Sequence, residues 1–82
     1  MNLNNQTAEQ MDPHLYTMLK SMCEAQISKA KMTLKLLSKS PAGIGDHSTK
    51  DFYENADEAL TKLAEAQDKL ECLDRNYQVN NI

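Results

Sequence analysis

Apolar residues recur every three or four positions along two long segments, which is the spacing of one face of an α-helix. The first segment runs from Pro13 to about Ser38 and the second from about Thr49 to Tyr77. Between them, residues 39–48 hold three of the four Gly and Pro residues of the chain and favour a turn. Two helices of about 40 Å each, joined by one short connection, predict an all-α antiparallel hairpin.

The ends of the helices carry capping signals. Asp12 is a good N-cap residue, and Pro13 is favoured at the first helical position because no intrahelical bond needs its missing N–H. Ser48 is the predicted N-cap of the second helix, with Asp51 three residues further on. Residues 1–11 show no periodicity and are expected to form a flexible tail, and residues 78–82 are expected to fray.

The second helix shows one apolar stripe, as expected of a helix that packs against a single neighbour. Its residues are Phe52, Ala56, Ala59, Leu60, Leu63, Ala66, Leu70, Leu73 and Tyr77.

The first helix shows two apolar stripes. One consists of Tyr16, Leu19, Cys23, Ile27, Ala30, Leu34 and Leu37. The other, interrupted by Lys29, consists of Leu15, Met18, Met22, Ala25, Met32 and Leu36. One partner helix covers only one stripe, so the second is either the exposed edge of one broad face or an interface with another molecule.

Chain length favours the second of these interpretations. An 82-residue domain without Trp buries a small core, and small scaffolds usually need a partner or a covalent link. A twofold dimer buries a second seam with no new sequence. We therefore predict a homodimer that packs as a four-helix bundle, with the Leu- and Met-containing stripe of the first helix as the self-association interface.

Charge divides the chain into a basic and an acidic half. The first helix carries five lysines and one acid, whereas the second is mainly acidic, with expected i,i+4 ion pairs Glu58–Lys62, Glu65–Lys69 and Glu71–Arg75. The net charge of −3 disfavours a nucleic-acid binder, which usually has a basic excess. Lys29, Lys31, Lys35 and Lys39 nevertheless keep a nucleic-acid-associated accessory protein as the alternative function.

No cluster of residues points to catalysis, a cofactor or a metal. His14 and His47 lack a second ligand at a metal-binding spacing, and a local hydrogen bond or cap is the favoured role for Asp46-His47. Gly43-Ile44-Gly45 lacks the preceding strand and third glycine of a phosphate-binding loop. We therefore predict a protein that is not an enzyme.

The two cysteines and the polar N-terminus favour a cytoplasmic protein. The sequence shows no apolar run of about 20 residues for a membrane span and no signal-peptide pattern before Met11. Cys23 and Cys72 are expected to be free thiols in a reducing compartment. Both lie at similar distances from the turn, so a disulfide between them stays open.

The turn Pro41-Ala42-Gly43-Ile44-Gly45-Asp46-His47-Ser48, with the acidic Ala/Leu-rich segment up to Leu73, resembles short uncharacterised proteins of T4-like phages, particularly those of marine cyanobacteria. This resemblance implies a virus-encoded protein made in the cytoplasm of a bacterial host, and it transfers no catalytic or binding residue. From the residues themselves we expect a non-enzymatic helical interaction module that self-associates and can bind a host or phage protein.

Overall fold

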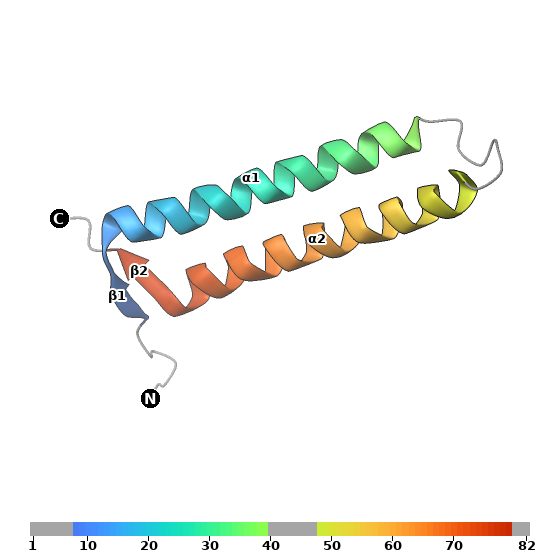
Figure 1. Ribbon diagram of the computed structural model, residues 1–82. Helices are drawn as coiled ribbons and strands as arrows, with labels where there is room; N and C mark the ends of the chain where they lie inside the picture. The colour runs from blue at the N-terminus through green and yellow to red at the C-terminus, as the bar shows by residue number, and fades with distance from the viewer. Residues whose placement is uncertain (1–7, 40–47, 80–82) are drawn as a thin grey trace.

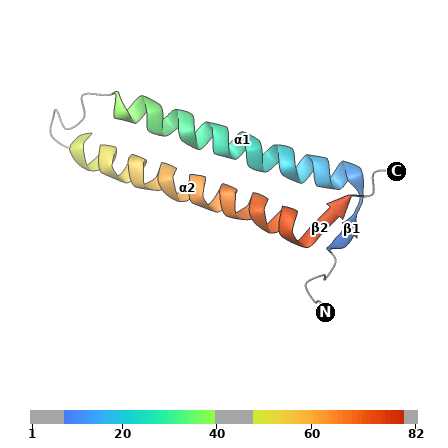
Figure 2. The ribbon, with the colours of Figure 1, turned by 180° about the vertical axis from the view of Figure 1, so that it is seen from behind.

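Two long helices lie side by side in opposite directions, and a small sheet lies at one end (Figures 1 and 2). The computed structural model describes residues 8–39 and 48–79. Most of the predicted turn and of the predicted N-terminal tail falls outside these residues. The elements, in chain order, are β1 (Glu9–Met11), α1 (Pro13–Ser38), α2 (Ser48–Asn76) and β2 (Tyr77–Val79).

Helix α1 begins where the capping signals predict. The Asp12 carboxylate accepts hydrogen bonds from the backbone N–H groups of His14, at 2.8 Å, and Leu15, at 3.2 Å. These donors would otherwise lack partners in the first turn, and Pro13 has none to satisfy. At the other end the Lys39 N–H donates to the Leu36 carbonyl, at 3.2 Å, which tightens the final turn.

Helix α2 is shifted by one residue from the predicted range of 49–77. It spans Ser48–Asn76, so Ser48 is helical and Tyr77 already belongs to β2. Asp51 lies in its first turn and Arg75 in its last, where each charge opposes the partial charge of the helix end.

The short sheet corrects the prediction of unstructured ends and of a purely α-helical chain. Residues 9–11, assigned to the tail, form β1, and residues 77–79, assigned to the end of the second helix and the fraying segment, form β2. The strands are parallel, with Glu9 opposite Tyr77 and Met11 opposite Val79. Three-residue strands are too short to show a period of two, and this pairing joins segments that local patterns treat separately.

The contact between α1 and α2 decides which stripe of α1 is internal. Every residue of the stripe from Tyr16 to Leu37, hereafter the inner stripe, is buried or half-buried. Of the five hydrophobic residues that are buried within residues 8–39 and 48–79, three are alanines, which allow two helix backbones to approach closely. The buried residues are Cys23, Ala30, Ala59, Ala66 and Leu73.

Leu60 departs from the predicted seam of α2. Its side chain is 56% exposed, whereas its neighbour Ala59 is buried. One residue step rotates a helix by about 100°, so Ala59 and Leu60 cannot both face α1. Both residues are apolar, so the sequence pattern alone does not distinguish the buried position from the exposed one.

The hairpin is elongated and has no third layer among the described elements. Its radius of gyration is 18.1 Å, against about 12 Å for a compact domain of this length. The principal extents are 58 × 28 × 16 Å. Each helix therefore has one side covered by its neighbour and its other sides open to solvent.

Candidate interaction surface

The second apolar stripe of α1, hereafter the outer stripe, is exposed along its whole length. Its large side chains are 44% (Leu15), 46% (Met18), 51% (Met22), 54% (Met32) and 62% (Leu36) exposed, and Ala25 is exposed as well. These five are most of the seven large hydrophobic residues exposed in the described ranges. The other two, Tyr53 and Leu60, lie on α2. The structure thus gathers exposed apolar surface on the residues predicted as the interface.

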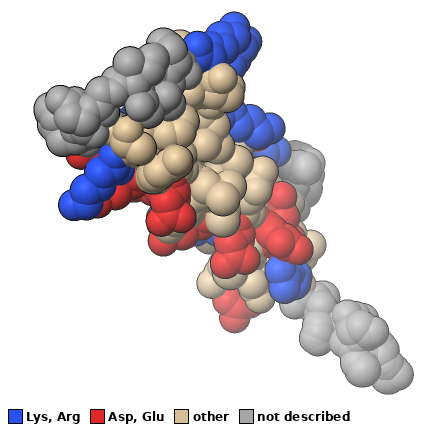
Figure 3. Space-filling view, turned by 90° about the vertical axis from the view of Figure 1, so that its right-hand side faces the viewer, with Lys and Arg blue, Asp and Glu red and all other residues tan. Residues whose placement is uncertain are grey.

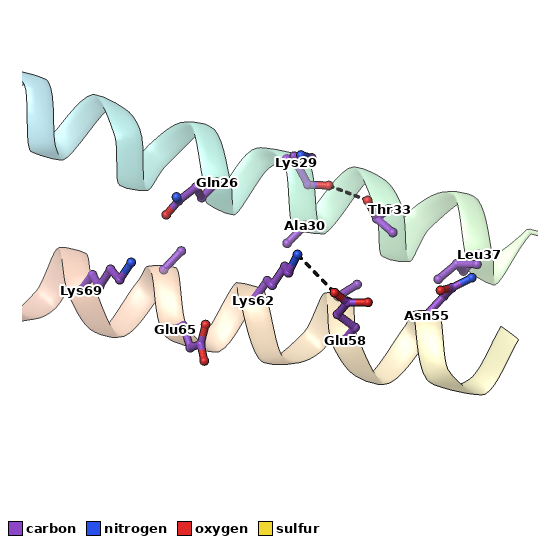
Figure 4. A pocket seen from close by; sticks show the side chains of 12 residues that line it. Gln26, Lys29, Ala30, Thr33, Leu37, Asn55, Glu58, Lys62, Glu65 and Lys69 are labelled. Carbon is purple, nitrogen blue, oxygen red and sulfur yellow. Dashed lines mark hydrogen bonds and ion pairs between the residues drawn. The ribbon is translucent and has the colours of Figure 1, made fainter. Parts of the chain in front are cut away.

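A groove of about 480 Å³ runs between the helices beside the outer stripe. Ala30, Ala59 and Ala66 contribute small apolar side chains, while polar side chains from both helices surround them (Figure 4). Lys29, the residue that interrupts the outer stripe, is one of the lining residues on α1. The outer stripe and the groove therefore belong to one face of the hairpin.

The α2 side of the groove is charged. Its lining residues are Asn55, Glu58, Lys62, Glu65 and Lys69, together with the two alanines. Lys62 and Glu58 form an ion pair of 3.3 Å, drawn as a dashed line in Figure 4. An apolar partner on this face would thus contact α1 and meet mainly charged groups on α2.

The ion pairs in residues 8–39 and 48–79 lie within α2 or at the start of α1, and none connects the two helices. Two of the three expected pairs form: Glu58–Lys62, at 3.3 Å, and Glu71–Arg75, at 3.4 Å. A further pair, Lys50–Glu54, forms at 3.4 Å, whereas none is found between Glu65 and Lys69. All are exposed pairs within one helix, and pairs of this kind contribute only about 0.3–0.5 kcal/mol.

Figure 3 views the end of the molecule where α1 ends and α2 begins, with uncharged residues at the centre and charged ones around them. Basic side chains lie at the edges of this view, and acidic ones gather in its lower part. Among the described residues, none that is polar or charged is buried.

A side-chain hydrogen bond joins the two helices near the sheet. The Tyr16 hydroxyl donates to Asp74 Oδ1 at 2.5 Å. This bond to the Asp74 carboxylate raises the pKa of Tyr16 above 10.0, and partial desolvation and the negative charges of Asp74 and Glu24 add to the effect. The bond places Tyr16 of α1 level with Asp74 of α2 at this end.

Both cysteines are free thiols, as the sequence predicts. Cys23 is buried on the inner stripe, whereas Cys72 is exposed on α2. The Cys72 sulfur accepts a hydrogen bond from the Asn76 side-chain amide at 3.5 Å. The two side chains therefore lie in different environments.

No group of three or more potential metal-binding side chains occurs within the described part of the chain. His14 Nδ1 lies 3.9 Å from Asp12 Oδ1, a local contact at the start of α1. His47 and Asp46 fall outside the described ranges. Neither α1 nor α2 is long and apolar enough to cross a membrane.

Comparisons with protein families, with curated proteins and with solved structures find no match to this chain.

Sequence reasoning identified the outer stripe but missed two features of the site. The first is the groove, which depends on small residues of two separate helices lying opposite each other. The second is the bond between Tyr16 and Asp74, which are 58 positions apart. The sequence signal for this bond is Tyr16 on the otherwise mainly aliphatic inner stripe, because a hydroxyl at a contact between helices needs a polar partner.

Proposed function

We propose that this protein is a non-enzymatic helical interaction module that self-associates through the outer stripe of α1. The observation that carries the proposal is that five of the seven exposed large hydrophobic side chains in the described part of the chain lie on this one stripe. Isolated exposed apolar residues are common on protein surfaces, whereas several exposed apolar residues gathered in one row are typical of an interface. The methionines suit this role because their flexible side chains adapt to a partner surface.

The energy of burial supports a reversible dimer. Covering five side chains that are about half exposed contributes about 1 kcal/mol each, or about 10 kcal/mol for two copies. Association costs at least about 4 kcal/mol in lost translational and rotational freedom. The remaining 6 kcal/mol or so corresponds to a dissociation constant no tighter than about 40 μM. The proposed dimer forms a four-helix bundle with the two copies of α1 at its centre.

The proposal is tested by sedimentation of matched charge variants over protein concentrations of about 10 μM to 1 mM, which run from below to well above the tightest dissociation constant that the burial energy allows. Met22→Glu places a carboxylate in the middle of the outer stripe, and Ser28→Glu places the same charge at an exposed position of α1 outside the stripe. We expect Met22→Glu to remain monomeric and Ser28→Glu to dimerise like the parent. A parent that stays monomeric throughout the range contradicts self-association.

The same stripe is suited to a helix of another protein, and the resemblance to phage proteins suggests a bacterial or phage protein as that partner. Such a helix would supply an apolar face at i, i+3, i+4 and i+7 spacing. Capture of proteins from a bacterial lysate tests this alternative. If the parent is monomeric and captures one protein, and if Met22→Glu prevents that capture while Ser28→Glu does not, the captured protein replaces the second copy as the partner.

A nucleic-acid-associated role is the second candidate, and the lysines near the C-terminal end of α1 and at its C-cap favour it. Lys31, Lys35 and Lys39 lie at i,i+4 spacing, are exposed, and form no ion pair with other described residues. A row of cations can contact phosphates, with affinity that falls steeply as salt is added. An electrophoretic shift of random-sequence DNA at low salt, lost in Lys31→Gln/Lys35→Gln, would support this role, and no shift would exclude it.

A further inference from the structure

The outer stripe has an internal symmetry once Lys29 is included. The seven positions are separated alternately by three and four residues, and all seven side chains are exposed. The types of residue are nearly the same in both directions, with Leu at each end, Met next and Ala in the middle. The order is Leu15, Met18, Met22, Ala25, Lys29, Met32 and Leu36.

We propose that α1 of a second copy covers this row in the antiparallel direction, with Ala25 of each copy meeting at the twofold axis. The inference rests on the proposed self-association and adds the orientation and register of the partner. The 3-4 spacing is that of helices that pack in a left-handed coil. The resulting layers are Leu15 with Leu36, Met18 with Met32, Met22 with Lys29, and Ala25 with Ala25.

Alanine at the axis allows the closest contact to form at the centre of the pair. The small side chain of Ala25 lets two helix backbones approach, as Ala30, Ala59 and Ala66 do inside the hairpin. Larger Leu and Met side chains at both ends then fill the widening space. A row that is symmetric about a small residue is self-complementary, which is the requirement of a twofold interface.

The charge of Lys29 distinguishes antiparallel from parallel pairing. Parallel pairing in register would place two Lys29 ammonium groups against each other within an apolar contact, which is unfavourable. Antiparallel pairing places Lys29 opposite Met22 and separates the two Lys29 Cα atoms by about 11 Å along the axis. The stem of Lys29 can then cover apolar surface while its ammonium group reaches solvent.

The exposed apolar area favours a second copy as the occupant. Covering the five large side chains of this row, each about half exposed, on both copies contributes more than the minimum cost of association. A second copy also offers a row of matching length and nearly the same residue types.

Disulfide trapping tests both the contact and its direction. The background is the full chain with Cys72→Ser, in which buried Cys23 serves as the internal thiol that should not cross-link. Single substitutions Ala25→Cys, Met18→Cys and Met32→Cys are made in this background and incubated in a glutathione redox buffer at about 1 mM protein, above the expected dissociation constant. The products are separated by non-reducing electrophoresis.

We expect Ala25→Cys to form a covalent dimer readily. Met18→Cys should not cross-link with itself, because its two copies would lie about 21 Å apart along the axis, far beyond the reach of a disulfide. Met18→Cys mixed with Met32→Cys should give the mixed dimer. Self-cross-linking of Met18→Cys without the mixed product would show parallel pairing and overturn this inference, while self-association through the outer stripe would stand. Failure of all three, with a monomeric parent in sedimentation, would overturn both.

Discussion

A matched pair of leucine substitutions on α2 tests which of its residues face α1. The side chain of Leu73 is 7% exposed, and that of Leu60 is 56% exposed, although both lie on the apolar stripe of α2 identified from the sequence. Buried Leu→Ala substitutions typically destabilise by about 2–5 kcal/mol. Leu73 lies near the end of α2, where the surroundings can relax, so we expect Leu73→Ala to cost about 2–3 kcal/mol. For Leu60→Ala we expect less than about 1 kcal/mol, because about half of its area already contacts water.

The measurement is urea unfolding followed by far-ultraviolet circular dichroism at one protein concentration, since association changes apparent stability. A domain of this length has a free energy of unfolding of about 4–12 kcal/mol, so Leu73→Ala should move the midpoint clearly. The slope of the free energy of unfolding against urea concentration should stay unchanged, because the shift in midpoint then reflects a change in stability alone. Equal losses for the two variants, or a larger loss for Leu60→Ala, would refute the assigned packing face of α2.

Three further outcomes follow from local contacts. Asp12→Ala should lower the free energy of unfolding by about 1 kcal/mol because the N-cap is lost. Asp12→Asn keeps an accepting oxygen and should retain most of that stability, and the midpoints of urea unfolding of the two variants test this. Tyr16 should deprotonate above pH 10.0 in the folded state. The contribution of its bond with Asp74 to folding stability is therefore complete below pH 10.0 and is lost as pH rises through the folded pKa of Tyr16. In an absorbance titration, Asp74→Asn should lower that pKa toward 10.0. Cys72 should react with a thiol reagent in the native protein and Cys23 only on unfolding; equal native rates would show that Cys23 is accessible.

The parts of the fold that the sequence predicted depend on strong local signals. Asp12 and Pro13 specify a helix start through backbone chemistry within a few residues, and the structure has α1 begin there. The two stripes of α1 lie on different faces of the helix, and α2 covers only one of them. Periodicity specified the pair of stripes, but packing against α2 was needed to show which stripe is internal.

The features that sequence analysis missed depend on contacts between distant residues. Pairing of Glu9–Met11 with Tyr77–Val79 requires the hairpin to bring the two ends together first. Leu60 has the same apolar character as Leu63, and only the rotation of α2 separates an exposed position from a half-buried one. The groove likewise arises from side chains of both helices and has no signature in either one alone.

Methyl NMR on dilution tests the proposed interface most directly, because it reports on individual side chains of the unmodified chain. Between about 1 mM and 10 μM, concentrations on either side of the expected dissociation constant, the methyl resonances of Met18, Met22 and Met32 should shift together. The methyl groups of Leu60, equally exposed but on α2 and outside the groove, should not shift. Methionine resonances that stay constant over this range, or shifts confined to Leu60, would contradict self-association through the outer stripe.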